Sequence, residues 1–200
     1  MQNTGALILA AGGSSRLGQP KQFLVFQDET LLRATAKAAI IAGCHPIVVV
    51  AGQVADRVRD EVRDLPVHLV LNANWQSGLG SSIKCGVAHL RRIEPNLRAL
   101  IILPCDQPFV SAGIIQQLSQ TDKPIVASSY ADTVGVPAVF RSIYFDALSS
   151  LPDNSGAKSL IEANRTDLGT ISFPGGAIDI DNQADYDQLT GKSKNASRSC

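Results

Sequence analysis

Short runs of aliphatic residues alternate along the first two thirds of the chain with longer segments in which apolar residues recur every three or four positions. The short runs are typical of strands buried on both faces, and the longer segments of amphipathic helices. Such an alternation predicts an α/β fold, with helices on both faces of a mostly parallel, Rossmann-like sheet. The predicted strands are Ala6–Leu9, Ile47–Val50, Val67–Leu71, Leu100–Leu103 and Ile125–Ala127, and the predicted helices are Leu31–Ala42, Val54–Leu65, Ser81–Ile93 and Ala112–Leu118.

The pattern is less regular after residue 130, where strands and helices are still predicted but are spaced unevenly. We expect these elements to extend the same sheet, which gives a single three-layer α/β/α domain over residues 1–190. Residues 191–200 are polar and basic and are predicted to form a flexible tail. The later elements are a strand at Val136–Phe140, helices at Ser142–Ser150 and Ala157–Ala163, a strand near Thr170–Phe173 and a helix from Asn182.

Composition and charge exclude several classes of function. Eighteen basic residues balance eighteen acidic ones, so no overall field attracts nucleic acid or an anionic membrane. The four cysteines form no Cys-x-x-Cys pair, which argues against a zinc site and a disulfide framework. Only a short apolar run precedes Gly12, too short for a signal peptide or a membrane span, so we expect a cytoplasmic protein.

The most informative loop follows the first predicted strand. Residues 7–21 read LILAAGGSSRLGQPK, in which small residues and two cations come directly after buried positions. Glycines allow consecutive backbone N–H groups to converge on an anion, and Arg16 and Lys21 add positive charge for triphosphate oxygens. A Walker A motif needs a lysine after its last glycine, whereas Gly18 is followed by Gln19. The glycine spacing Gly-x-Gly-x-x-Gly of dinucleotide-binding loops is also absent. A flexible connection with solvated charges is the alternative.

A carboxylate follows the predicted strand Leu100–Leu103, in the sequence Pro-Cys-Asp-Gln-Pro. Mg²⁺ prefers one or two carboxylates together with substrate phosphates, so Asp106 is the first candidate ligand. The alternative is a turn aspartate that bonds its own backbone before Pro108. Asp179 and Asp181, two residues apart, offer a second carboxylate, although Asp181 or Asn182 also makes sense as a helix N-cap.

The loop that joins the third predicted strand to the third predicted helix suggests a second anion site. It carries Asn72, the single tryptophan Trp75 and, after two glycines, Ser81 and Ser82. Either serine can cap the helix, whose N-terminal N–H groups favour an anion. Capping alone also explains the serines, and a tryptophan is more often a core residue than a ligand platform.

Taken in order, these motifs resemble those of the MobA-like NTP transferase family, most closely molybdenum cofactor cytidylyltransferase. The first loop is similar to the family's Leu-Ala-Ala-Gly-x-Ser-x-Arg-Met-Gly-x-x-Lys, with Leu17 in place of Met. Asp106-Gln107-Pro108 resembles the family's Asp-Gln-Pro, and Asp179-Ile180-Asp181 its Asp-Ile-Asp. Gly135–Phe140 and Asp153–Leu160 resemble acceptor-side motifs, with Lys158 at the last cation of the second. The matches run from Leu7 to Tyr186 and cover nearly the whole chain.

The resemblance implies a nucleotide-diphospho-sugar transferase-like fold and an enzyme that transfers NMP from an NTP to a phosphorylated acceptor, a molybdopterin-type cofactor, with release of pyrophosphate. CTP is favoured, and GTP stays open because Pro104-Cys105-Asp106 resembles the guanylyltransferase branch. The implied catalytic residues are Arg16, Lys21 and Asp106, and the implied metal ligands for Mg²⁺ are Asp106 and Asp181. The nucleotide-binding residues are Leu9, Ala10, Ala11, Gly12, Gly13, Ser14, Ser15, Arg16, Lys21, Gly80, Ser81, Ser82 and Asp106.

Two other functions remain open at this stage. A sugar-phosphate or polyol-phosphate nucleotidyltransferase would use the same loop and metal, and a nucleotide-binding chaperone would deliver a cofactor without catalysis. A molybdoenzyme or its chaperone is the expected protein partner, and neither nucleic acid nor a membrane is expected.

Overall fold

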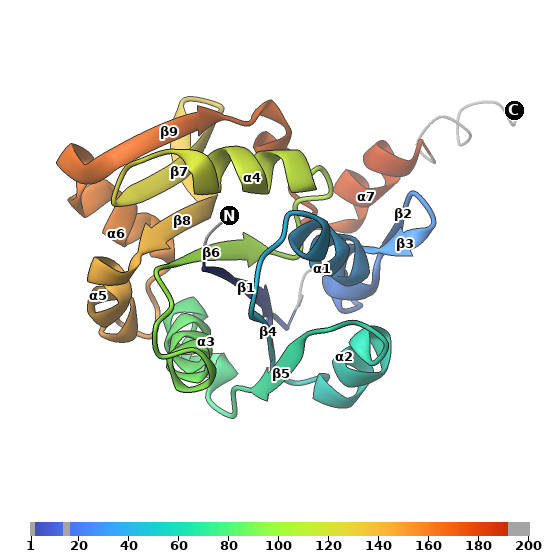
Figure 1. Cartoon of the computed structure of the whole chain (residues 1–200). Helices are drawn as coiled ribbons and strands as arrows, with labels where there is room; N and C mark the ends of the chain where they lie inside the picture. The colour runs from blue at the N-terminus through green and yellow to red at the C-terminus, as the bar shows by residue number, and fades with distance from the viewer. Residues whose placement is uncertain (1–2, 14–16, 192–200) are drawn as a thin grey trace, which may run out of the picture.

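A computed structural model describes residues 3–13 and 17–191 of the chain. These residues form a seven-stranded sheet with helices on both faces and a small hairpin at its rim (Figure 1). None of the described helices is both long and apolar enough to cross a membrane. The strands are β1 (Thr4–Ala10), β2 (Val25–Phe26), β3 (Glu29–Thr30), β4 (Ile47–Ala51), β5 (His68–Leu71), β6 (Ala99–Pro104), β7 (Ile125–Tyr130), β8 (Thr133–Arg141) and β9 (Leu168–Ser172).

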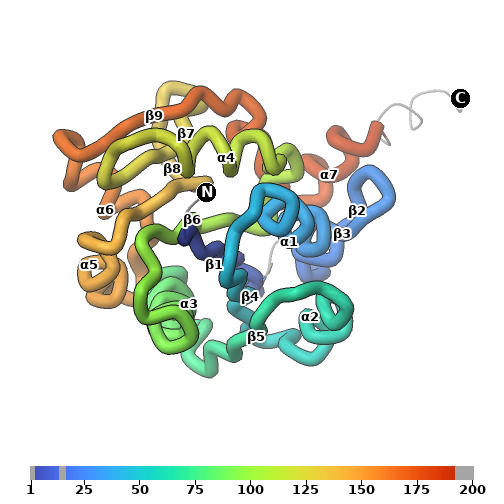
Figure 2. Tube along the Cα trace, viewed as in Figure 1, coloured from blue at the N-terminus to red at the C-terminus, as the bar shows by residue number. Residues whose placement is uncertain are grey.

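The α-helices cover the sheet in two layers. They are α1 (Leu31–Ile41), α2 (Ala55–Val62), α3 (Leu79–Ile93), α4 (Ala112–Gln120), α5 (Phe145–Ser149), α6 (Ala157–Ala163) and α7 (Gln183–Thr190). Helices α1, α2 and α4 lie on one face, and α3, α5 and α6 lie on the other (Figure 2). Helix α7 lies apart from both layers, beside the β2–β3 hairpin (Figure 1). The α/β/α architecture predicted from the sequence is confirmed.

The strand order β5-β4-β1-β6-β8-β7-β9 places the first strand near the middle of the sheet. Strands β5, β4, β1 and β6 are parallel to one another, whereas β8 is antiparallel to both of its neighbours, β6 and β7. After β1 the chain builds β4 and β5 on one side and then crosses over to β6 on the other. The carboxyl ends of β1 and β6 therefore flank the switch in strand order, where ligands bind in open α/β sheets.

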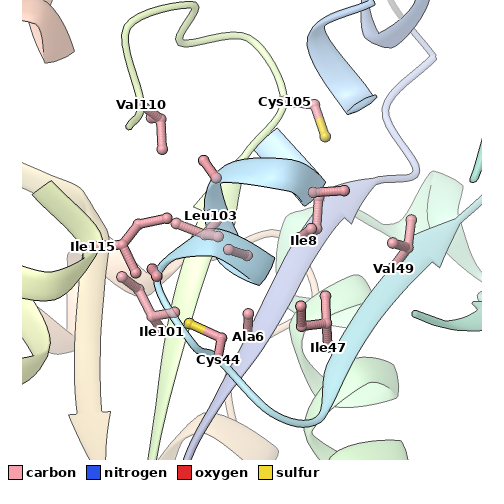
Figure 3. Close-up of a cluster of buried hydrophobic side chains, with 14 of the residues drawn as sticks. Ala6, Ile8, Cys44, Ile47, Val49, Ile101, Leu103, Cys105, Val110 and Ile115 are labelled. Atoms are coloured by element: carbon pink, nitrogen blue, oxygen red, sulfur yellow. The ribbon is translucent and has the colours of Figure 1, made fainter. Parts of the chain in front are cut away.

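Two hydrophobic clusters fill the spaces between the sheet and its helices. Alternate side chains of a strand point to opposite faces, so Ala6 and Ile8 of β1 join one cluster while Leu7 joins the other. Figure 3 shows part of the first cluster, including Ile101 and Leu103 of β6. The central strands are fully buried on both faces, which explains why they read in the sequence as unbroken aliphatic runs.

A third, smaller cluster ties the end of the described chain to the loop region after β1. Its buried members are Leu17, Leu24, Leu31 and Ile180, with Tyr186 packed against them. The Tyr186 hydroxyl also donates a hydrogen bond to the Val25 carbonyl oxygen at 2.8 Å. The β2–β3 hairpin and α7 therefore form one rim of the molecule and hold Asp181 near the carboxyl end of the sheet.

Several element boundaries and one capping prediction differ from the sequence-based expectation. Helix α3 begins at Leu79, and its N-cap is Gly78, so the expected capping role of Ser81 or Ser82 is wrong. The Ser81 hydroxyl instead donates to the carbonyl oxygens of Asn74 and Gly78. Residues 142–150, expected to be one helix, form a 3₁₀ turn followed by the short α5. Residues 192–200 of the predicted flexible tail lie outside the described residues.

Candidate active site

A cavity of about 600 Å³ opens at the carboxyl ends of β1 and β6. One wall is the backbone that leaves β1, from Leu9 to Gly13, and the opposite wall is the segment from Pro104 to Gln107 that leaves β6. Two further parts of the wall come from the loop and helix around Trp75 and from the start of α6. The remaining lining residues are Lys21, Gln22, Gln76, Gly78, Leu79, Ser82, Ile83, Ile102, Tyr130, Gly135, Val136, Gly156, Ala157, Lys158 and Asp179.

Lys21 joins two carboxylates at this cavity. Its ammonium nitrogen lies 2.5 Å from Oδ2 of Asp106 and 3.3 Å from Oδ1 of Asp181. Pro20 directs the chain into a 3₁₀ turn at Lys21–Phe23, and the buried Gln22 anchors that turn by donating to the Ala10 carbonyl oxygen at 3.2 Å. The loop after β1 is thereby fixed at its far end, with Lys21 pointing at the acids.

The ionic group at Lys21 is charged over the whole physiological range. Partial burial lowers the pKa of Lys21, but the adjacent charge of Asp106, its hydrogen bond and the charge of Asp181 outweigh burial, so the net pKa is raised. The Lys21 and Asp106 side chains each keep about a quarter of their surface exposed, 24% in both cases. This exposure leaves the pair accessible to a ligand that enters the cavity.

The segment around Asp179 and Asp181 approaches from the C-terminal part of the chain. The Ile180 backbone N–H donates to the Asp106 carbonyl oxygen at 3.0 Å, and the Ile180 side chain is fully buried. With Ile180 pointing inward, Asp179 lines the cavity and Asp181 reaches Lys21. Burial raises the pKa of Asp179, and the negative charges of Asp181 and Asp106 add to that rise. Three carboxylates therefore share this corner.

The structure confirms the helix-cap interpretation of this segment, and the metal role of Asp181 stays a prediction. Asn182 is the N-cap of α7 and forms a capping box with Asp185. Oδ2 of Asp185 also accepts a hydrogen bond from the Asp181 backbone N–H at 3.0 Å. The helix start therefore fixes the residue that contacts Lys21, although residues 179–181 are extended without being part of a strand.

The glycine-rich loop is described as far as Gly13 and again from Leu17. Leu9, Ala10, Ala11, Gly12 and Gly13 all line the cavity. A β-carbon at Gly13 would lie 3.0 Å from the Trp75 ring, whereas one at Gly12 would meet nothing within 4 Å. The expected contributions of Ser14, Ser15 and Arg16 concern positions outside the described residues.

The loop before α3 closes another side of the cavity. The buried Asn72 donates through Nδ2 to the hydroxyl oxygens of Ser81 and Ser82, at 2.9 and 3.0 Å. Ser82 lines the cavity, whereas Gly80 and Ser81 pack behind the wall. A β-carbon at Gly80 would lie 2.1 Å from the Pro152 carbonyl oxygen, so this glycine allows the start of α3 to pack closely on the loop before α6.

Several lining residues were not among the sequence candidates. Gln107 follows the predicted acid Asp106, so a motif contained it, but no pattern distinguished it as ligand-facing. Tyr130 and Val136 come from β7 and β8, whose place in the sheet is not visible in the sequence. Trp75, for which a core position was favoured, is half-buried in the cavity wall against Gly13 and Gly52.

The acidic corner suits a hard divalent cation that is shared with a ligand. Within residues 3–13 and 17–191, no group of three or more His, Cys, Asp or Glu side chains is arranged to hold a metal ion by itself. Carboxylate oxygens of Asp106 and Asp181 already converge on one cation, the Lys21 ammonium. Oxygen ligands in this number match Mg²⁺ or Mn²⁺ when phosphate oxygens complete the coordination.

Fold and cavity together define an α/β domain with a polar ligand site at the switch point of its sheet. The sequence profile of the MobA-like NTP transferase domain matches residues 6–168. The chain belongs to this family, as its motifs indicated, and the predicted fold class and family are both confirmed.

Individual relatives agree with this membership. The nicotine blue oxidoreductase of Paenarthrobacter nicotinovorans is 36% identical over 140 residues, which are 69% of this chain and 66% of that protein, so the match spans just under two thirds of the relative's length. The purine catabolism protein PucB of Bacillus subtilis is 24% identical over 92% of this chain and 94% of its own.

Among solved structures, Rv0371c of Mycobacterium tuberculosis H37Rv superposes with a TM-score of 0.82 at 28% identity. The superposition covers 94% of this chain and 98% of that one. A second crystal structure of Rv0371c, a complex with manganese, gives a TM-score of 0.78 at 26% identity and the same coverage of both chains.

Proposed function

We propose that the protein transfers NMP from an NTP, with CTP favoured and GTP possible, to the phosphate of a molybdopterin-type cofactor. The observation that carries the proposal is the contact of Lys21 with Asp106 and Asp181 beside Gly12 and Gly13. This arrangement puts positive charge, a glycine-rich backbone and carboxylates in the wall of one cavity of about 600 Å³, which is large enough for two substrates. The reaction belongs in the cytoplasm, where NTPs are available and thiols stay reduced.

In this reaction an oxygen of the acceptor phosphate attacks the α-phosphorus of the NTP. A new P–O bond forms, the bond from the α-phosphorus to the bridging oxygen of the β-phosphate breaks, and pyrophosphate leaves with that electron pair. The attacking oxygen is already anionic, so no general base is needed. The role of the chain is to hold two negatively charged reactants in line and to offset their repulsion.

Different residues of the cavity bind the triphosphate, offset its charge and hold the metal in this proposal. The backbone from Leu9 to Gly13 and the proposed cation Arg16 hold the triphosphate, and Lys21 offsets the charge on the phosphates. Asp106, with Asp181 as a second ligand, would hold Mg²⁺. When bound, the metal supplies charge neutralisation at the phosphate oxygens.

The lining of the cavity supports a flat, ring-shaped acceptor with few hydroxyl groups over a sugar. Trp75, Leu79, Ile83, Val136 and Ala157 present ring and aliphatic surface to the space beside the ionic corner. Polyhydroxylated sugars need many paired donors and acceptors, because each unmatched polar group loses its hydrogen bonds to water. A sugar-phosphate or polyol-phosphate acceptor is therefore the second choice, and a non-catalytic cofactor chaperone is the third.

The name of one relative adds a further alternative of a different kind. Nicotine blue oxidoreductase is 36% identical over the matched region, and its name describes a redox reaction. A redox reaction in this chain would need a bound electron carrier and would release no pyrophosphate. Pyrophosphate release therefore separates the two chemistries directly.

The test combines each NTP with Mg²⁺ and either molybdopterin or a sugar 1-phosphate, and measures pyrophosphate release. We expect release with CTP and molybdopterin, and a loss of roughly 10²–10³ in rate for Asp106→Asn, or about 2–4 kcal/mol of barrier. Asp56→Asn on the exposed face of α2 is the matched control, because its side chain is 93% exposed and pairs with Arg59 of the same helix. Turnover of folded Asp106→Asn protein at the control rate would overturn the metal role of Asp106.

A further inference from the structure

Gln107 holds a buried amide in the cavity wall on the side of β7 and β8. It follows Asp106 directly, and its relative exposure is 7%. Its Nε2 donates to the Gly176 carbonyl oxygen at 3.2 Å and to the Tyr130 hydroxyl at 3.5 Å. Because a carbonyl oxygen only accepts hydrogen bonds, the amide nitrogen must face Gly176, and this fixes the orientation of the amide.

The other end of the same amide lacks a partner. Gln107 Oε1 is buried and accepts no hydrogen bond from any residue that the structure describes. The Tyr130 hydroxyl, which accepts from Nε2, donates its proton to the Val136 carbonyl oxygen at 3.1 Å and so has none left for Oε1. A buried acceptor without a donor is uncommon in folded proteins and calls for a ligand, an ion or a water molecule.

The position of Gln107 indicates which substrate would supply that donor. The cavity extends from the ends of β4 and β1, where Trp75 packs against Gly52 and Gly13, to the ends of β6 and β7. The phosphate-binding backbone lies in the first part, and Gln107 lies in the second. An NTP held by the loop after β1 therefore leaves the β7 side to the acceptor.

We propose that Gln107 Oε1 accepts a hydrogen bond from an amino or ring N–H group of a flat heterocyclic acceptor, which makes Gln107 a specificity-determining residue. The inference rests on the proposed function and adds to it the chemical feature by which the acceptor is recognised. The Asp179 carboxylate lines the same cavity and is a second acceptor of hydrogen bonds. A ligand whose edge carries N–H donors would pair with these two acceptors.

The neighbouring groups are consistent with an acceptor-rich wall. Burial raises the pKa of Tyr130, the hydrogen bond from Gln107 lowers it, and the negative charges of Asp179 and Asp106 raise it again. Asp179 therefore lies close enough to Tyr130 to influence its pKa. Gln107 Oε1 is buried in this structure, so a ligand N–H would reach it only after the terminal amide turns and its two Nε2 hydrogen bonds lengthen. The torsion that turns a Gln amide is broad, so the torsion itself adds little to that cost.

The experiment compares two probes that differ only at the amino group, 2-amino-4-oxopteridine and 4-oxopteridine. Their dissociation constants are measured by fluorescence titration with Mg²⁺ and CTP present, for the wild-type protein and for Gln107→Met. We expect the wild-type protein to bind the amino compound about tenfold more tightly, as for one hydrogen bond, and the variant to bind both equally. A purely structural role would weaken both probes together.

Two further variants separate the recognition role from effects on folding. Tyr130→Phe removes the neighbouring hydroxyl but keeps Gln107 Oε1, so it should keep the preference for the amino compound. Gln107→Leu removes the same acceptor oxygen with another apolar side chain in case Gln107→Met does not fold, and it should bind both probes equally.

Each negative result has a separate meaning. Equal affinity of the wild-type protein for both probes, or an undiminished preference in Gln107→Met, would overturn the inference even if nucleotidyl transfer is found. If the wild-type protein releases no pyrophosphate with any phosphorylated acceptor, the proposed function itself is wrong.

Discussion

Lys21 is the residue on which the charge balance of the cavity depends. Asp106 and Asp181 would repel each other without a cation between them, and the Lys21 ammonium lies within 3.3 Å of both. Because all three side chains are partly exposed, the attraction is worth less than that of a fully buried pair. In the proposed function Mg²⁺ would meet the same two carboxylates, so the Lys21 ammonium and the metal would compete for them when no nucleotide is bound.

The competition gives a prediction for Lys21→Met. Without nucleotide, the variant should bind Mn²⁺ about fivefold more tightly than the wild-type protein, since about 1 kcal/mol of competing attraction is removed. Titration calorimetry, or the electron paramagnetic resonance signal of free Mn²⁺, measures this affinity without any turnover. With nucleotide present, the same variant should lose roughly 10²–10³ in rate.

Lys123→Met is the charge-matched control for that titration, because Lys123 lies beside Gly169 and contacts none of the cavity acids. It should leave the Mn²⁺ affinity at the wild-type value. Equal affinities in the wild-type protein and Lys21→Met would show that the ammonium does not occupy the metal position.

At the scale of elements, close packing of α3 determines the shape of the cavity wall. Gly80 lets the first turn of α3 approach the loop at residues 152–155, and its backbone N–H donates to the Asp153 carbonyl oxygen at 2.8 Å. Lys84 of the same helix pairs with the Asp153 side chain. The start of α6 follows this loop, so any shift of the loop also moves Gly156, Ala157 and Lys158 in the cavity wall.

Two glycine substitutions in helices should therefore act in opposite directions. Gly80→Ala forces a β-carbon against backbone carbonyl oxygens and should lower the free energy of unfolding by about 1–3 kcal/mol. Gly113→Ala in α4 meets only the Ser111 hydroxyl at 3.8 Å and should raise that free energy by about 0.5–1 kcal/mol through helix propensity. Urea denaturation measures both, and a neutral Gly80→Ala would contradict the packing argument.

The sequence predicted some elements well because their burial leaves a direct pattern. Strands β1, β4 and β6 are buried on both faces, so their unbroken aliphatic runs located them to within a few residues. The insertion of β8 between β6 and β7 left no such signal, because alternation reveals a strand but not its partners. The two-residue strands β2 and β3 are too short for any periodicity.

The candidate site was predictable to the extent that it lies in loops after the first and fourth predicted strands. Lys21 and Asp106 were expected at one sheet edge, and the structure brings them into contact. Gln107 was named only as part of a motif, since nothing in the sequence shows that its oxygen lacks a donor. Tyr130 depends on the β7–β8 pairing, which the sequence does not reveal.

At the scale of the whole molecule, two buried thiols make stability depend on pH. Burial raises the pKa of Cys44 from 9.0 to about 12, and burial also raises the pKa of Cys105. Both thiols are neutral when protonated, so the folded state holds these protons more tightly than the unfolded chain does. Their contribution to stability is complete below about pH 9 and is lost as the pH rises from 9 toward 12.

The free energy of unfolding should consequently fall above pH 9, by as much as about 1.4 kcal/mol per pH unit for each thiol. Guanidinium denaturation at several values between pH 8 and pH 10.5 measures the slope. Cys44→Ala should have a shallower slope than the wild-type protein, whatever its stability at pH 8. Parallel slopes in the two proteins would show that Cys44 does not cause the loss.

The family profile ends at residue 168, whereas Asp179, Asp181 and α7 come after it. The segment is held in place by its own capping box at the start of α7 and by the hydrogen bond from Tyr186 to Val25 of the β2–β3 hairpin. A substitution in this segment would therefore alter one wall of the cavity while the backbone that leaves β1 stayed intact. Variation there would change the ligand that fits the cavity without rebuilding the sheet beneath it.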